Sequence, residues 1–108
     1  MPDRMFDAEL SVERDDAVVR LAGDLDIASV PTLESVLGGA YGRAGDVRRI
    51  VLEMAAVEFI DSSGLTALIK AHRQAVELDL RLVLRRPSER VTRTLQLTQL
   101  ETVLEVER

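Results

Sequence analysis

A short stretch in the middle of the chain, residues 59–65, joins two segments that have different hydrophobic periods. Upstream, residues 50–54 form a compact apolar run of strand length, which is typical of a strand buried on both faces of a sheet. Downstream, side chains recur at helical spacing and define one stripe, made of Leu65, Leu68, Ile69, His72 and Val76. A buried strand that leads directly into an amphipathic helix favours an α/β fold.

The junction itself carries the residues that begin a helix. Asp61, Ser62 or Ser63 can each act as the N-cap, because a side-chain oxygen accepts a hydrogen bond from a first-turn amide. Gly64 lowers helix propensity by about 1 kcal/mol relative to Ala, which indicates a sharp bend or a close backbone approach. A phosphoryl group on either serine would be stabilised by the helix N-terminus, whereas the plainer interpretation is that the serines only cap the helix.

The N-terminal part of the chain predicts a hairpin followed by a helix. Apolar and polar residues alternate from Phe6 to Glu13, and residues 17–22 form a second strand after a polar turn at 14–16. Residues 23–26, Gly-Asp-Leu-Asp, are expected to end that strand. A helix then begins after Ser29 and ends in a Gly-rich segment.

The C-terminal part predicts a strand at residues 80–85, a short helix that opens at 87–88 and a last strand at 102–106. The expected fold class is therefore α/β, in one domain spanning residues 1–108, with a mixed sheet, an N-terminal hairpin and helices packed on the sheet.

Composition excludes several classes of protein. A net charge of −5 and few aromatic residues argue against nucleic-acid binding, and an acidic chain more naturally meets a basic protein surface. With no Cys and a single His, neither a disulfide framework nor a zinc site is expected, and no cofactor or metal is predicted. Residues 1–5 lack the pattern of a signal peptide, and no apolar run reaches the roughly 20 residues of a membrane span. We therefore expect a cytoplasmic protein without membrane insertion.

Catalytic chemistry finds little support in the sequence. The G-x-S-x-G motif is absent around Ser62 and Ser63, and His72 lies ten residues along the same helix, about 15 Å away. His72 is predicted to be a partly buried structural residue with a satisfied hydrogen bond. Asp24 and Asp26 are too few for a convincing cation site and are expected to serve a turn and a helix cap. The Gly-rich segment lacks the Lys-Ser/Thr ending of a phosphate-binding loop, so nucleotide binding would be weak and an enzyme is not expected.

Two motifs together resemble the STAS domain family, and within it the bacterial anti-sigma factor antagonists. They are residues 23–26 after a strand, and residues 59–65, Phe-Ile-Asp-Ser-Ser-Gly-Leu, between a strand and a helix. The resemblance implies that Ser62 is phosphorylated by an anti-sigma factor that is itself a serine kinase. It further implies that the unmodified protein binds this anti-sigma factor and releases the sigma factor, and that a serine phosphatase resets the modified form.

The same resemblance and the α/β topology define a partner-binding face. The loops before the first two helices should meet at one end of the sheet, where α/β proteins place their binding sites. The residues predicted for this face are Leu25, Asp26, Ile60, Asp61, Ser62, Ser63, Gly64 and Leu65. An alternative function is a static STAS scaffold, as a subunit of a transporter or a stress-signalling assembly.

The chain also departs from the family pattern at two places. Residues 77–79 and 97–100 lack the Gly that the family commonly has there.

Overall fold

The sheet begins with an antiparallel hairpin and continues with parallel strands. The computed structural model describes residues 6–108, and residues 1–5, on which the signal-peptide argument rests, lie outside the described residues. The elements are, in chain order, β1 (Asp7–Glu13), β2 (Asp16–Leu25), α1 (Val30–Tyr41), β3 (Arg49–Ile60), α2 (Ser62–Glu77), β4 (Arg81–Arg85), α3 (Glu89–Leu97), a 3₁₀ turn (Leu100–Thr102) and β5 (Glu105–Glu107). The strand order is β1-β2-β3-β4-β5, with all pairs after the hairpin parallel. The predicted α/β class with a mixed sheet and an N-terminal hairpin is confirmed.

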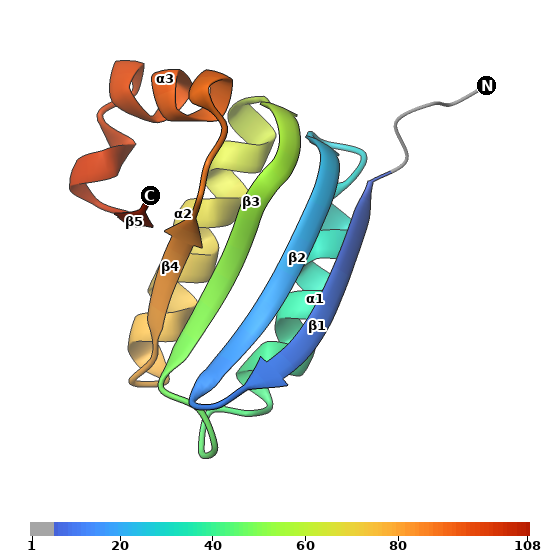
Figure 1. Cartoon of the computed structure of the whole chain (residues 1–108), viewed down its shortest axis with the longest axis vertical. Coiled ribbons are helices and arrows are strands. Elements are labelled where there is room, and N and C mark those ends of the chain that lie inside the picture. The colour runs from blue at the N-terminus through green and yellow to red at the C-terminus, as the bar shows by residue number, and fades with distance from the viewer. Residues whose placement is uncertain (1–5) are drawn as a thin grey trace.

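One face of the sheet carries the main hydrophobic core. Helices α1 and α2 lie side by side on this face, while α3 lies across the end of β3 (Figure 1). The central strand β3 sends Ile50, Leu52 and Met54 into the core, and all three are fully buried. Both helices contribute side chains that recur at helical spacing and are buried in the same core. These are Leu33, Leu37 and Ala40 of α1 and Ala67, Leu68, Ala71 and Ala75 of α2. Burial of each such Leu or Ile stabilises the folded state by about 1.5–3 kcal/mol. The core on this face therefore fixes the positions of the strands and helices that carry the functional site.

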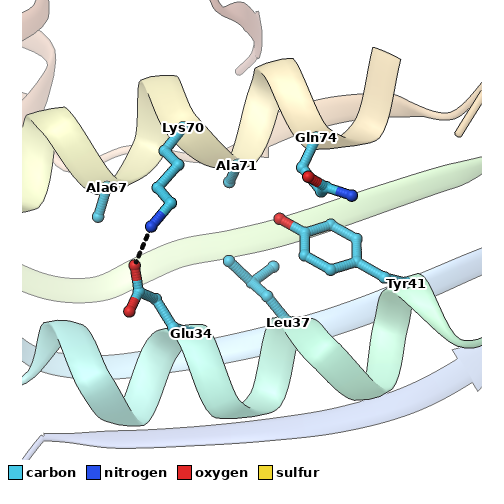
Figure 2. Close-up of a pocket in the computed structure, with 7 residues that line it drawn as sticks. All are labelled: Glu34, Leu37, Tyr41, Ala67, Lys70, Ala71 and Gln74. Atoms are coloured by element: carbon cyan, nitrogen blue, oxygen red, sulfur yellow. Dashed lines mark hydrogen bonds and ion pairs between the residues drawn. The ribbon is translucent and has the colours of Figure 1, made fainter. Parts of the chain in front are cut away.

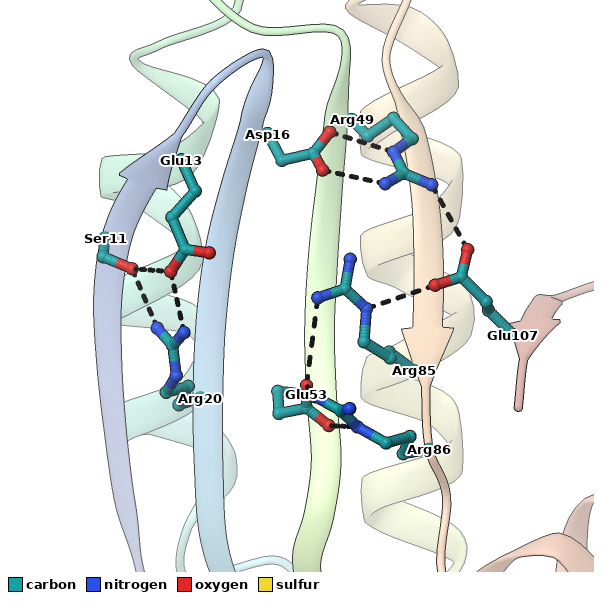
Figure 3. Close-up of polar contacts among 9 residues, drawn as sticks. All are labelled: Ser11, Glu13, Asp16, Arg20, Arg49, Glu53, Arg85, Arg86 and Glu107. Atoms are coloured by element: carbon teal, nitrogen blue, oxygen red, sulfur yellow. Dashed lines mark hydrogen bonds and ion pairs between the residues drawn. The ribbon is translucent and has the colours of Figure 1, made fainter.

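No helix covers the opposite face of the sheet within the described residues, yet three of its valines are buried. Val18, Val51 and Val83 are at most 1% exposed. Figure 3 shows that charged side chains from β1 to β5 lie over this face and pair with one another. Long arginine stems cover apolar surface while their guanidinium groups remain hydrated, which explains how these valines are shielded.

The ion pairs on this open face form a connected network. Arg49 donates to both carboxylate oxygens of Asp16, at 2.9 and 2.8 Å, and the hydrogen bond from Arg49 lowers the pKa of Asp16. Glu53 pairs with Arg86 and lies 4.0 Å from Arg85, and the hydrogen bond from Arg86 lowers the pKa of Glu53. Because the charges are matched across the strands, this face is neutralised and is a poor candidate for a charged partner.

One expected element boundary in the N-terminal half is wrong, and a tertiary contact explains it. Strand β2 continues through residues 23–26 as far as Leu25, with Gly23 at a φ of 102°, because its pairing with β3 persists after two register shifts. Helix α1 ends in the Gly-rich segment, as predicted, with Tyr41 as its last residue and Gly42 as its C-cap. Gly39 lies against β1, where an added Cβ would come within 3.2 Å of Leu10, so the glycine allows the helix to approach the strand.

The C-terminal region also differs from the prediction. The expected strand at residues 102–106 is in fact a 3₁₀ turn followed by a strand at 105–107. Two positions where the family commonly has Gly adopt left-handed backbone without it, since Asp79 has a φ of 59° and Gln99 a φ of 60°. Such conformations cost a non-Gly residue about 1–2 kcal/mol.

Candidate functional site

The two loops that precede α1 and α2 are joined at the carboxyl end of the sheet. Leu25 pairs with Ile60 at the end of the β2–β3 ladder, and the amide of Asp61 donates to the carbonyl oxygen of Leu25 at 3.2 Å. The loop before α1 is braced by Ser29, whose hydroxyl donates to the carbonyl of Asp24 and accepts from the amide of Asp26, both at 2.8 Å. The predicted convergence of the two loops is therefore observed.

Ser62 is the first residue of α2 and is exposed to solvent. The N-cap is Asp61, whose carboxylate accepts a hydrogen bond from the amide of Gly64 at 2.9 Å. Within residues 6–108 the Ser62 hydroxyl makes no hydrogen bond, because Asp61 already performs the capping, whereas the Ser62 carbonyl accepts from Thr66. The prediction that Ser62 lies at the helix N-terminus with an accessible hydroxyl is confirmed. Ser63, the next residue, is half-buried.

Gly64 fits this junction because no side chain has room there. A Cβ on Gly64 would lie 2.4 Å from the carbonyl oxygen of Leu25 and 2.8 Å from Cγ1 of Ile60. Contacts below 3.0 Å are essentially never seen for real Cβ atoms. The close backbone approach that the sequence indicated is thus present, and it presses the first turn of α2 onto the end of β2.

The predicted face divides into exposed residues and the residues that support them. Asp26 is half-buried, and its carboxylate accepts from the amides of Ala28 and Ser29 at 3.0 and 3.1 Å, which is the predicted turn role. The predicted helix-capping role is wrong for Asp26, because the N-cap of α1 is Ser29 and that helix start has no side-chain cap hydrogen bond. Leu65 is half-buried, but the side chains of Leu25 and Ile60 are 0% and 5% exposed and lie in the core. Leu25 and Ile60 therefore shape the face from beneath, and the binding role of all these residues stays a prediction.

Two exposed apolar residues at this end of the molecule were not among the residues predicted for the partner-binding face. Ile27 in the loop before α1 is 74% exposed and Phe59 near the end of β3 is 38% exposed. An isoleucine flanked by Asp26 and Ala28 in a polar loop is a weak signal of a contact residue. Phe59 offered no such signal, because its exposure results from the irregular pairing of β3 with β2.

His72 lies farther along α2 and differs from the prediction in one respect. It is half-buried, as expected, but its Nδ1 is buried and finds no hydrogen-bond partner within the described residues. The predicted satisfied hydrogen bond is therefore wrong. Ten residues of helix separate it from Ser62, about 15 Å, so the imidazole does not reach the Ser62 hydroxyl.

A groove of about 270 Å³ lies between α1 and α2. Figure 2 shows Leu37, Ala67 and Ala71 between the two helices, with Tyr41 and Gln74 at one end and Lys70 reaching across to Glu34, at 3.4 Å. Burial, together with the nearby Glu34 carboxylate, raises the pKa of Tyr41. This volume is below the roughly 300–1,000 Å³ of ordinary ligand pockets, and the two charged groups at the groove, Lys70 and Glu34, pair with each other.

No group of three or more His, Cys, Asp or Glu residues within 6–108 is placed to hold a metal ion. No helix in this part of the chain is long and apolar enough to span a bilayer. The Gly-rich segment is mostly helix and turn and forms no phosphate cradle after a strand.

The mixed sheet and the exposed serine at the start of α2 are both consistent with one known protein family. The model of the STAS domain family matches residues 7–108, and the chain belongs to this family.

Solved structures of anti-sigma factor antagonists are among those similar to this chain. The unphosphorylated form of the antagonist SpoIIAA is 25% identical with a TM-score of 0.69, over 96% of this chain and 88% of that one. The phosphorylated form of Bacillus SpoIIAA is 26% identical with a TM-score of 0.68, over 96% of this chain and 92% of that one. An anti-sigma factor antagonist from Mycobacterium paratuberculosis is 23% identical with a TM-score of 0.79, over 95% of this chain and 86% of that one. The murine anion transporter Solute Carrier 26 family member A9 shares the fold alone, at 17% identity and a TM-score of 0.71, over 81% of this chain and 14% of that one.

Proposed function

We propose that this chain is an anti-sigma factor antagonist, a binding module and not an enzyme. In this proposal the unphosphorylated chain binds an anti-sigma factor with serine kinase activity and so releases a sigma factor. Phosphorylation of Ser62 prevents that binding, and a serine phosphatase restores it. Transcription is thereby regulated through exchange of protein partners in the cytoplasm.

The observation that carries the proposal is the state of Ser62. Its hydroxyl is exposed, it makes no hydrogen bond within the described residues, and the cap of α2 is supplied by Asp61 instead. A kinase can therefore modify Ser62 without removing a contact that holds the fold together. The similarity to SpoIIAA, which has been solved in unphosphorylated and phosphorylated forms, supports the same assignment.

The physical effect of the modification is large enough for a switch. A phosphoryl group adds about −1.5 to −2 charges at pH 7, next to the Asp61 carboxylate and on a chain whose net charge is already −5. Within a desolvated interface, repulsion and unpaired phosphate oxygens would weaken binding. A coupling of about 3 kcal/mol changes an affinity roughly 150-fold.

The test requires the cognate partner, which co-purification from the native cell followed by mass spectrometry would identify. Kinase assays on Ser62→Ala and Ser63→Ala should show phosphate transfer to the second variant and not to the first. Ser62→Ala should also bind the partner constitutively, and Ser62→Asp should bind more weakly. Loss of phosphorylation in Ser63→Ala alone would move the acceptor by one residue, and loss in neither variant would contradict the switch.

A further inference from the structure

A second hollow lies between β3 and α3, at the carboxyl end of the sheet where Ser62 also lies. We name it the β3–α3 groove, and its volume is about 350 Å³. Its lining includes Phe59, Ile60, Arg90, Arg93, Thr94 and Leu97. A smaller neighbouring hollow of about 290 Å³ shares Arg90 and Arg93 with it and adds Glu89.

The groove displays apolar surface that the fold does not use. Phe59 is 38% exposed and Leu97 is 78% exposed. Strand β3 places 12 residues opposite the 10 of β2, and one of the register shifts falls immediately before Phe59. Irregular pairing of this kind redirects a side chain, and here both Glu58 and Phe59 point outward between the buried Val57 and Ile60.

The charges at the rim of the groove are positive and find no ionic partner among residues 6–108. The guanidinium of Arg90 lies over the Phe59 ring, 5.6 Å from its centroid. Neither Arg90 nor Arg93 forms an ion pair within residues 6–108, although Glu89 precedes them on the same helix. On the sheet, by contrast, Arg49 and Arg85 both form ion pairs, with Asp16 and Glu107 respectively. The groove therefore combines exposed apolar side chains with two free cations on a chain that is acidic overall.

We propose that the β3–α3 groove docks an acidic segment of a protein partner, with an apolar side chain of that segment seated against Phe59 and Leu97 and its carboxylates on Arg90 and Arg93. The inference rests on the proposed function, because Phe59 precedes Ser62 by three residues, about 10 Å of extended chain. A partner bound over Ser62 can thus reach this groove and gain a second contact. Nucleic acid fits less well, since duplex binders commonly engage six to ten phosphates and this groove offers two cations.

The experiment uses the ¹⁵N-labelled full chain and the peptide acetyl-Glu-Asp-Leu-Phe-Glu-Asp-amide in an NMR titration at low salt. The largest amide shifts should fall on α3 and the end of β3. The double variant Arg90→Gln/Arg93→Gln should weaken binding by about tenfold or more, because it removes both complementary charges. A matched control, Arg43→Gln/Arg48→Gln, changes two exposed arginines without ion pairs in the described chain and should leave the affinity unchanged.

Three results would overturn the inference: equal peptide affinity for wild type and the groove double variant, shifts confined to other surfaces, or binding of a single-stranded oligonucleotide or anionic vesicles in place of the peptide. A peptide in which lysine replaces each acidic residue should not bind. The variant Ser62→Asp should retain peptide binding, because the groove does not include Ser62. The groove and the Ser62 switch are therefore tested by different variants, and either can fail alone.

Discussion

Replacing Gly64 with Ala tests the packing that positions Ser62. The new Cβ would lie 2.4 Å from the Leu25 carbonyl oxygen and 2.8 Å from Cγ1 of Ile60. Reaching even 3.0 Å from that oxygen requires the first turn of α2 or the end of β2 to move by about 0.6 Å, a shift that strains the adjoining hydrogen bond between the Asp61 amide and Leu25.

The expected cost follows from three contributions. Overpacking costs about 1–3 kcal/mol, and weakening of one backbone hydrogen bond costs about 1 kcal/mol. The higher helix propensity of Ala returns about 1 kcal/mol. Gly64→Ala should therefore lower the free energy of unfolding by about 1–3 kcal/mol, which corresponds to a decrease in Tm of about 4–12 °C for a domain of this size.

Urea unfolding followed by circular dichroism would measure this change. The matched control is Gly38→Ala, because Gly38 is an exposed residue of α1 whose added Cβ meets nothing within 4 Å. This control should raise the free energy of unfolding by about 0.5–1 kcal/mol. If Gly64→Ala were as stable as wild type, or were stabilised like the control, the close approach between α2 and β2 would be refuted.

Three further predictions concern stability. The hydrogen-bonded Asp16 and Glu53 have pKa values below their ordinary 3.8 and 4.5, so the stability they contribute is present above about pH 5 and is lost as pH falls through the lowered values. Glu53→Gln should cost about 1 kcal/mol at pH 7 and flatten the acid limb of a stability–pH profile, and an unchanged profile would contradict the open-face network. Gln99→Gly should add about 1 kcal/mol in urea unfolding by relieving left-handed backbone, while Gln96→Gly within α3 should remove about 1 kcal/mol, and equal effects would argue against this assignment. Asp61→Ala should cost about 0.5–2 kcal/mol and speed hydrogen exchange of the Gly64 amide, and unchanged exchange would mean that Asp61 is not the cap.

The junction at residues 59–65 was predictable because its signals are local. A buried strand, a capping carboxylate and an amphipathic stripe all lie within residues 50–76, and each has a direct physical meaning. Ser62 was therefore placed correctly at the start of α2. The N-cap itself remained open among Asp61, Ser62 and Ser63, since all three side chains can accept the same hydrogen bond.

The remaining features depend on contacts between distant parts of the chain. Gly23 reads locally as the end of a strand, but pairing with β3 carries β2 onward to Leu25. The exposure of Phe59 follows from the same irregular pairing. No residue near Arg85 in the sequence identifies its ionic partner, yet β5 brings Glu107 within 3.2 Å of it. His72 follows the helical stripe, but the lack of a partner for its Nδ1 depends on the packing around α2.

In the proposed function, the charge on Ser62 decides whether the partner binds. Titration calorimetry of the anti-sigma kinase identified by co-purification, against the chain before and after stoichiometric phosphorylation of Ser62, measures this directly. The phosphorylated chain should bind at least roughly 150-fold more weakly, equivalent to about 3 kcal/mol. Equal affinities for the two forms would contradict it.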